Sequence, residues 1–226
     1  MANPIAQVVL LAVLVCNAHA GTIVNTFGTG QSFLSPPGET IGGGILRNDP
    51  PPNIGVTQAF GFTPASAASL SQIDLAMQYI FLAGRATGPA NLDVSIATNS
   101  LGQPGTLLET IHLTNVLGSV PFQPGIVSAV SVSHPLLQAG TSYWLVVAPP
   151  DLANTAFDWL ISPLTTLSIP SATRLGSGPW ITGNTNQPLA FDVSGTAAVP
   201  EPNSLFMMLT AVGAIGLLTT GRRGSR

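Results

Sequence analysis

Few side chains of this 226-residue chain could carry out acid–base or nucleophilic chemistry. His112 and His134 are the only histidines after residue 20, and neither lies in a His-Glu-x-x-His or beside a Gly-x-Ser-x-Gly pattern. We therefore expect both to be surface histidines. Because Cys16 is the single cysteine, a transition-metal site is not expected either. The sequence predicts no catalytic residue, no metal site and no cofactor.

Carboxylates are the remaining catalytic possibility, because glycosidases use two of them across a cleft. The acids of residues 21–199 are scattered along the sequence. Some pair can always be chosen from such a set, so a pair alone does not indicate a glycosidase. Asp151, Asp158 and Asp192 could supply oxygen ligands to Ca²⁺, but no Asp-rich loop surrounds them. Solvated strand or loop positions are the favoured interpretation, and a secreted glycan hydrolase is the last-ranked alternative.

The three tryptophans offer the best case for a ligand, since flat aromatic faces can stack on sugar rings. Trp144 lies in a continuous apolar segment, and Trp159 shares a strand face with Phe157, so both are expected in the core. Trp180 follows Gly178 and Pro179, where a loop could expose it. It is the candidate ligand contact.

Charge and composition restrict the class of protein. Only 7% of residues are charged, no Lys occurs, and 24 Gly and 20 Pro disfavour long helices. Between residues 21 and 199, three arginines face a larger number of acids, so there is no basic stripe and nucleic-acid binding is excluded. A surface so poor in charge is typical of extracellular β domains.

Segments that alternate apolar and polar residues recur between turn signals and predict strands. Residues 92–96 and 106–113 should form a hairpin with a loop longer than two residues, in which 102–105 make a type II turn. Residues 28–55 are irregular and should form a long loop or covering segment. We predict an all-β fold, an antiparallel β-sandwich that is jelly-roll-like. Further strands are expected at 58–62, 70–81, 125–132, 141–148, 155–161 and 189–193.

The C-terminal residues 199–226 have the features of a targeting signal and a membrane anchor. Val199, Pro200, Glu201 and Pro202 precede an apolar run, and Arg222 and Arg223 follow it. The charge-free residues 205–220 would form a helix about 24 Å long, so a single transmembrane helix is placed at about 203–220, with the arginines on the cytoplasmic side. The alternative is a buried C-terminal helix, which the lack of a polar stripe disfavours.

The N-terminal residues 1–20 fit a signal peptide. Residues 5–15 are apolar, and Ala18 and Ala20 give the small-x-small pattern that signal peptidase reads, leaving Gly21 as the new N-terminus. Lipidation of Cys16 is a disfavoured alternative, because Val15 precedes it. The residues between the two terminal targeting segments, 21–198, suffice for one β-sandwich ectodomain without disulfides.

The three-part tail resembles the PEP-CTERM sorting signal of exopolysaccharide-producing Gram-negative bacteria. The resemblance implies cleavage near the motif by a membrane exosortase, transient residence in the inner membrane, and then the cell surface or the extracellular space.

Several segments between residues 57 and 196 carry a second resemblance. They are Gln58-Ala59-Phe60, Leu70, Ile73-Asp74-Leu75, residues 102–105, Leu107-Leu108-Glu109, Leu137, residues 139–147, Trp159, Trp180 and Ala190-Phe191-Asp192-Val193. With these segments, residues 57–196 resemble the choice-of-anchor domains, most closely the R type, a family that supplies no catalytic residues. We expect a noncatalytic structural or adhesive surface or matrix protein linked to exopolysaccharide or biofilm, with an exopolysaccharide-binding module as the alternative.

Overall fold

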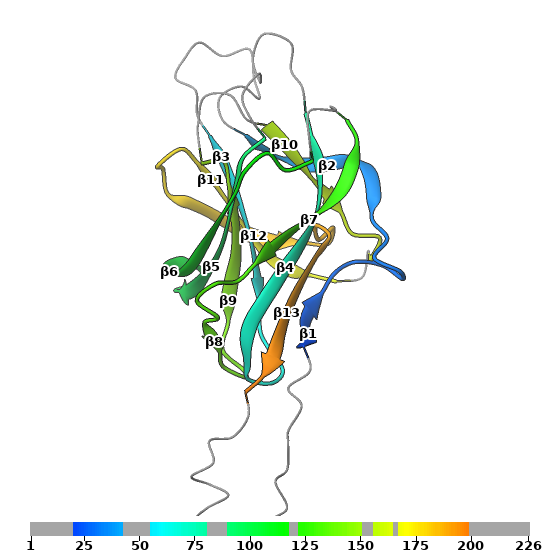
Figure 1. Cartoon of the computed structure of the whole chain (residues 1–226). Helices are drawn as coiled ribbons and strands as arrows, with labels where there is room; N and C mark the ends of the chain where they lie inside the picture. The colour runs from blue at the N-terminus through cyan, green and yellow to red at the C-terminus, as the bar shows by residue number, and fades with distance from the viewer. Residues whose placement is uncertain are drawn as a thin grey trace, which may run out of the picture. The chain divides into compact units, whose positions relative to one another are not determined.

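The structure, a computed structural model, describes residues 20–42, 55–80, 90–117, 122–150, 156–164 and 167–198. These residues form an all-β, antiparallel fold in which every strand belongs to one curled sheet (Figure 1). The predicted fold class is confirmed to that extent. The strands are β1 (Ala20–Asn25), β2 (Leu34–Gly42), β3 (Val56–Phe62), β4 (Ala68–Tyr79), β5 (Leu92–Ser100), β6 (Gln103–Leu113), β7 (Pro124–Val130), β8 (Leu136–Leu137), β9 (Tyr143–Ala148), β10 (Ala156–Ile161), β11 (Ile169–Leu175), β12 (Trp180–Thr185) and β13 (Phe191–Ala197).

The sheet consists of two groups of strands. In the first, here the β4 group, β13 lies between β1 and β4, and β7 and β8 pair with the other edge of β4. In the second, the β9 group, the order is β12-β11-β3-β9-β5-β6. The aromatic rings of Phe60 on β3 and Phe191 on β13 have centroids 6.2 Å apart, so the two groups face each other across one core.

Strands β2 and β10 connect the two groups, and we call this side the joined edge. Strand β10 pairs with both β4 and β2, and Gly42 of β2 pairs with Val56 of β3. Phe157 and Trp159 of β10 are fully buried, as the sequence predicted. The Trp159 indole donates to the Ala190 carbonyl at 3.0 Å, and its ring packs edge-on against Phe60.

The opposite side is the open edge, where, among the described strands, β6 pairs only with β5 and β7 pairs only with β4. Across it, Glu109 of β6 accepts hydrogen bonds from the backbone N–H groups of Val132 and Ser133 at 2.7 and 2.9 Å, and from the Ser131 hydroxyl at 2.6 Å. Burial alone would raise the pKa of Glu109, but these bonds outweigh it and hold the pKa below its ordinary value. One carboxylate thus links the two groups.

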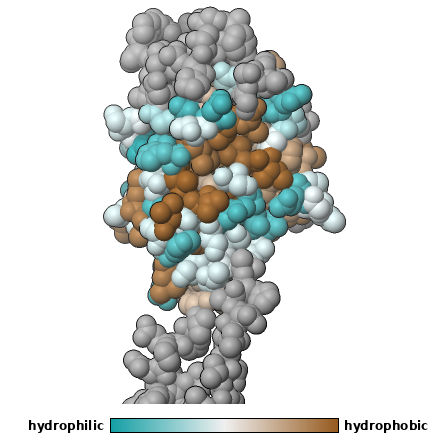
Figure 2. Space-filling view, in the orientation of Figure 1, coloured by the Kyte–Doolittle hydropathy of each residue, from teal (hydrophilic) through white to brown (hydrophobic). Residues whose placement is uncertain are grey.

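Apolar side chains are exposed near the open edge. Figure 2 shows them gathered around β7 and towards β6, with hydrophilic residues around them. Among the exposed large apolar side chains, Phe122, Ile126 and Val130 lie on β7 or just before it, and Leu107 and Leu108 lie on β6.

The β5–β6 hairpin differs from the expectation. Ser100 pairs with Gln103, so only Leu101 and Gly102 form the loop, and both have positive φ, 54° and 82°. Two adjacent positive φ values are typical of the type I′ turn that suits the twist of a hairpin. The predicted longer loop and the type II turn at 102–105 are therefore wrong, because Pro104 pairs with Asn99 inside the ladder.

Residues 28–55 were expected to form a long loop or covering segment, and the expectation of an irregular loop is wrong for residues 34–42, which form β2. Strand β2 contains Pro36 and Pro37 and pairs with β10. The register of this pairing shifts between Leu160, which pairs with Gly38, and Ile161, which pairs with Leu34. Gly38 allows the backbones of β2 and β10 to lie close together, because a Cβ at this position would meet the Trp159 carbonyl oxygen at 2.7 Å. Local Pro and Gly content indicated a loop, but pairing with β10 decides the conformation.

The predicted terminal segments lie outside the described residues. This applies to the signal peptide up to residue 19, including Ala18, and to the tail from residue 199 onward, with Val199, Pro200, Glu201, Pro202, Arg222 and Arg223. Within the residues that are described, no helix is long and apolar enough to cross a membrane. Ala20 and Gly21, at the predicted cleavage site, begin β1 and pair with Thr196 and Gly195 of β13.

Candidate functional site

The two faces of β9 divide the aromatic residues of the β9 group. Tyr143 packs into the main core, whereas Trp144 packs on the opposite face with small residues such as Ala59, Ala97 and Ala172. Trp144 is buried, as predicted, and its indole donates to the Asn99 side-chain oxygen at 2.9 Å. The small neighbours leave room for a large indole on this face.

Trp180 is the first residue of β12 and not part of an exposed loop. Its half-buried ring packs against the cluster that contains Trp144. Arg174, directly opposite on β11, places its guanidinium carbon 4.6 Å from the ring centroid. Such a cation–π contact covers part of an aromatic face, so Trp180 offers less free ring to a sugar than a loop position would.

A cleft lies where strand ends of the β9 group meet the end of β1. Its volume is about 500 Å³, within the range of small-molecule sites. The end of β1, the segment after β3, the β5–β6 turn, the start of β9 and the residues before β11 all line it. We call this the strand-end cleft; its lining residues are Val24, Asn25, Thr26, Gly61, Phe62, Thr63, Asn99, Gly102, Ser142, Tyr143, Trp144, Leu167, Ser168, Ile169 and Pro170.

The strand-end cleft combines aromatic and apolar walls with amide and hydroxyl groups, and its lining carries no charged side chain. Gly61 allows the close wall on one side, because a Cβ there would meet Pro170 at 2.9 Å. A second hollow of about 350 Å³ shares Asn99, Ser142 and Tyr143 with it. The two hollows together form an uncharged surface that is larger than either.

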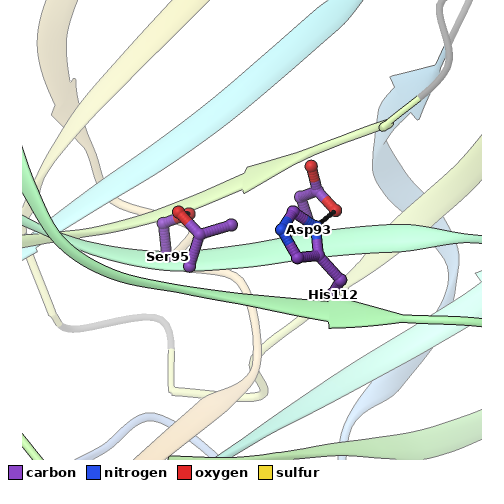
Figure 3. A network of polar contacts seen from close by, with 4 residues as sticks. Asp93, Ser95 and His112 are labelled. Atoms are coloured by element: carbon purple, nitrogen blue, oxygen red, sulfur yellow. Dashed lines mark hydrogen bonds and ion pairs between the residues drawn. The ribbon is translucent and has the colours of Figure 1, made fainter. Parts of the chain in front are cut away.

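His112 and Asp93 form the ion pair found among the described residues, with Nδ1 and Oδ1 2.8 Å apart (Figure 3). His112 is 72% exposed, which confirms the expected surface position. Ser95 lies on the same strand as Asp93, but its hydroxyl bonds to Thr110 at 2.9 Å. Because the serine is bonded to a threonine and not to the histidine, the group lacks the nucleophile–base contact of a catalytic triad.

Two acids come together on β4 and β13, where Asp74 pairs directly with Asp192. Burial, and then the charge of Asp74, raise the pKa of Asp192 to about 6. Asp74 accepts bonds from Gln72 and Ser128 at 2.8 and 2.6 Å, whereas Oδ1 of Asp192 is buried without a hydrogen-bond partner. Neither acid lines the strand-end cleft.

Asp158 and Asp192, two of the three acids considered above and disfavoured as Ca²⁺ ligands, lie on different strands. Asp158 lies on β10, where burial raises its pKa and a 3.0 Å bond from Thr40 partly offsets that effect, whereas Asp192 lies on β13. Asp151 falls outside the described residues. In the part of the chain that the structure describes, no three His, Cys, Asp or Glu residues cluster in a way that could hold a metal ion.

The sequence did not identify the strand-end cleft. Asn25, Asn99 and Ser142 come from three distant segments, and each looked like an ordinary turn or strand-end residue. A recurrence of Asn, Ser and Thr where strands begin or end would have been the available signal. Pairing of the strands is what places these side chains around one hollow.

The chain matches no protein-family model, and a search of curated proteins finds no significant match.

Proposed function

We propose that this is an exported, exosortase-sorted protein of the cell surface or extracellular matrix, with a noncatalytic structural or adhesive role linked to exopolysaccharide or biofilm. The three-part tail carries this proposal: Pro200-Glu201-Pro202, the apolar run and the arginines from Arg222 onward. Signal peptidase and exosortase are its processing partners. The inner membrane holds the chain only until the tail is cut.

The described ectodomain is compatible with a noncatalytic role. Three of the side chains that could carry out chemistry are engaged in structural contacts: Glu109 links the two strand groups, His112 pairs with Asp93, and Ser95 bonds to Thr110. We also propose that the curled sheet is a jelly-roll-like sandwich, since its two groups enclose one core.

A module that binds the exopolysaccharide is the second candidate. The observation that favours it is the strand-end cleft, with an aromatic and amide lining and a volume of about 500 Å³. Trp180 supports it less, because Arg174 covers part of its ring.

Mass spectrometry of the protein recovered outside the cell tests the first proposal. We expect the loss of residues 1–20 and of the tail after the Pro200-Glu201-Pro202 motif. The matched control is a strain without its exosortase, in which the tail should persist. Recovery of an intact tail from the strain with active exosortase would contradict the proposal.

A further inference from the structure

We propose that the strand-end cleft is a binding site for a neutral glycan, with Asn25, Asn99 and the Thr63–Ser142 hydroxyl pair as its polar contacts. This inference rests on the second candidate function and specifies both the site and the ligand class. It does not depend on how the tail is processed.

The two amides are held with their donors available. The Asn99 oxygen accepts the Trp144 indole N–H at 2.9 Å, and the Asn25 oxygen accepts the backbone N–H of Phe27 at 2.7 Å. Within the described residues, the Nδ2 groups of both side chains have no partner. Each fixed amide therefore presents N–H donors of the kind that a sugar hydroxyl accepts.

The hydroxyls of Thr63 and Ser142 lie 3.0 Å apart and are exposed. When one donates to the other, the second keeps its proton for an outside acceptor, and both keep lone pairs. This pair lies at the start of β9 and after β3, so it joins the same rim as Asn99. The rim thus offers both donors and acceptors, which matches the mixed character of sugar hydroxyls.

Charge decides between a neutral and an acidic glycan. The lining contains no Arg, Lys or His, so an anionic sugar would lose its hydration without a cation to replace it. Arg174 is the one Arg or Lys among the described residues, and it lies over the Trp180 ring, outside the cleft lining. Apolar walls such as Phe62, Ile169 and Pro170 suit the C–H faces of a neutral sugar.

The adjoining hollow indicates a chain and not a single sugar. It begins at the shared residues Asn99, Ser142 and Tyr143 and continues to Leu108 and Leu136. A ligand that extends from the strand-end cleft into this hollow passes the shared residues, of which Ser142 is an exposed one with a small side chain. A large side chain at position 142 should therefore block it.

The test titrates the exported protein with neutral oligosaccharides of glucose, mannose and galactose, and with oligogalacturonate as the acidic comparison. Heat of binding and tryptophan fluorescence are the two readouts, because Trp144 is bonded to Asn99 at the rim. We expect at least one neutral series to bind and oligogalacturonate not to bind. Ser142→Tyr and Asn99→Ala should each weaken binding at least about tenfold.

Ser177→Tyr is the matched control, since Ser177 is exposed in the turn between β11 and β12 and outside both hollows. It should bind like the unaltered protein, and equal melting temperatures confirm that the variants fold. Absence of binding to all three neutral series overturns the inference. So does a preference for oligogalacturonate, or loss of binding on Trp180→Ala but not on Ser142→Tyr. Each result leaves the mass-spectrometric test of sorting unaffected.

Discussion

The joined edge and the open edge of the curled sheet are held by different forces. At the joined edge, β10 buries Phe157 and Trp159 fully and pairs with strands on both sides. At the open edge, the structure describes no pairing between β6 and β7 within their stated bounds, and Glu109 of β6 bonds to the residues that follow β7. Apolar burial does not depend on pH, whereas a carboxylate link does. The two edges should therefore respond differently to mutation and to acid.

The largest effect is expected at the joined edge. Trp159→Ala should lower the free energy of unfolding by about 3–5 kcal/mol, because it leaves a cavity in the core and removes one of the two donors to the Ala190 carbonyl. Urea denaturation measures this loss. Trp180→Ala is the control for removing an indole, and it should cost clearly less because that ring is half-buried. Equal losses would contradict the contrast between the two sites.

At the open edge, Glu109→Ala should cost about 1–2 kcal/mol, since three hydrogen bonds to a charged acceptor are lost. The folded pKa of Glu109 is lowered, so its contribution is present above the ordinary value of 4.5 and is lost as pH falls through the folded pKa. Urea midpoints at neutral and acid pH measure both effects. Glu109→Gln, which keeps one acceptor oxygen, should lose less; a loss equal to that of Glu109→Ala would argue against the link.

The contribution of Asp192 to stability should depend on pH in the opposite direction to that of Glu109. Its folded pKa is raised from 3.8 to about 6, so the favourable contribution is complete below 3.8 and is lost as pH rises through about 6. Asp192→Asn should stabilise the protein at pH 7 by about 1 kcal/mol, after discounting for solvent at a half-exposed carboxyl. Below pH 3.8 the gain should vanish. A gain that is constant with pH would show that charge is not its origin.

The smallest effect is expected in the hairpin that ends at the open edge. Leu101 is fully exposed and has a φ of 54°, a conformation that Asn adopts more readily. Leu101→Asn should raise the free energy of unfolding by about 0.5 kcal/mol. Leu101→Ala, which also removes the exposed side chain but keeps the unfavourable φ, should give no such gain.

The sequence predicted most strands of the core, some from alternation and others, such as β9, from a continuous apolar segment that is buried on both faces. Val94 and Ile96 point into the core whereas Asp93 and Ser95 form the polar pairs of Figure 3, as period-two alternation requires. Strand β2 was missed because Pro36 and Pro37 are poor strand residues and only β10 makes the segment extend. Strand β12 was missed for a similar reason, since Gly178 and Pro179 precede it and Gly183 and Asn184 lie within it.

The candidate site could not be predicted in the same way. Trp180 was chosen for its chemistry, but its exposure depends on Arg174, which is six residues earlier and becomes its neighbour only through the β11–β12 pairing. Asn99 depends on a turn of two residues in place of the longer one expected. A site made of strand ends is a property of register, and register is set by contacts between distant segments.

The pairing of β1 with β13 has a consequence for the order of events during folding. β1 is the first described segment and β13 the last, and Ala20 pairs with Thr196. If the chain is exported from its N-terminus, as we propose, β1 emerges long before its partner strand, and closing so long a loop is slow. The β1–β13 ladder can form only after the residues between the two strands and β13 itself have left the translocation machinery. A truncated chain would keep an unpaired strand at its very beginning, available to proteases and to other chains.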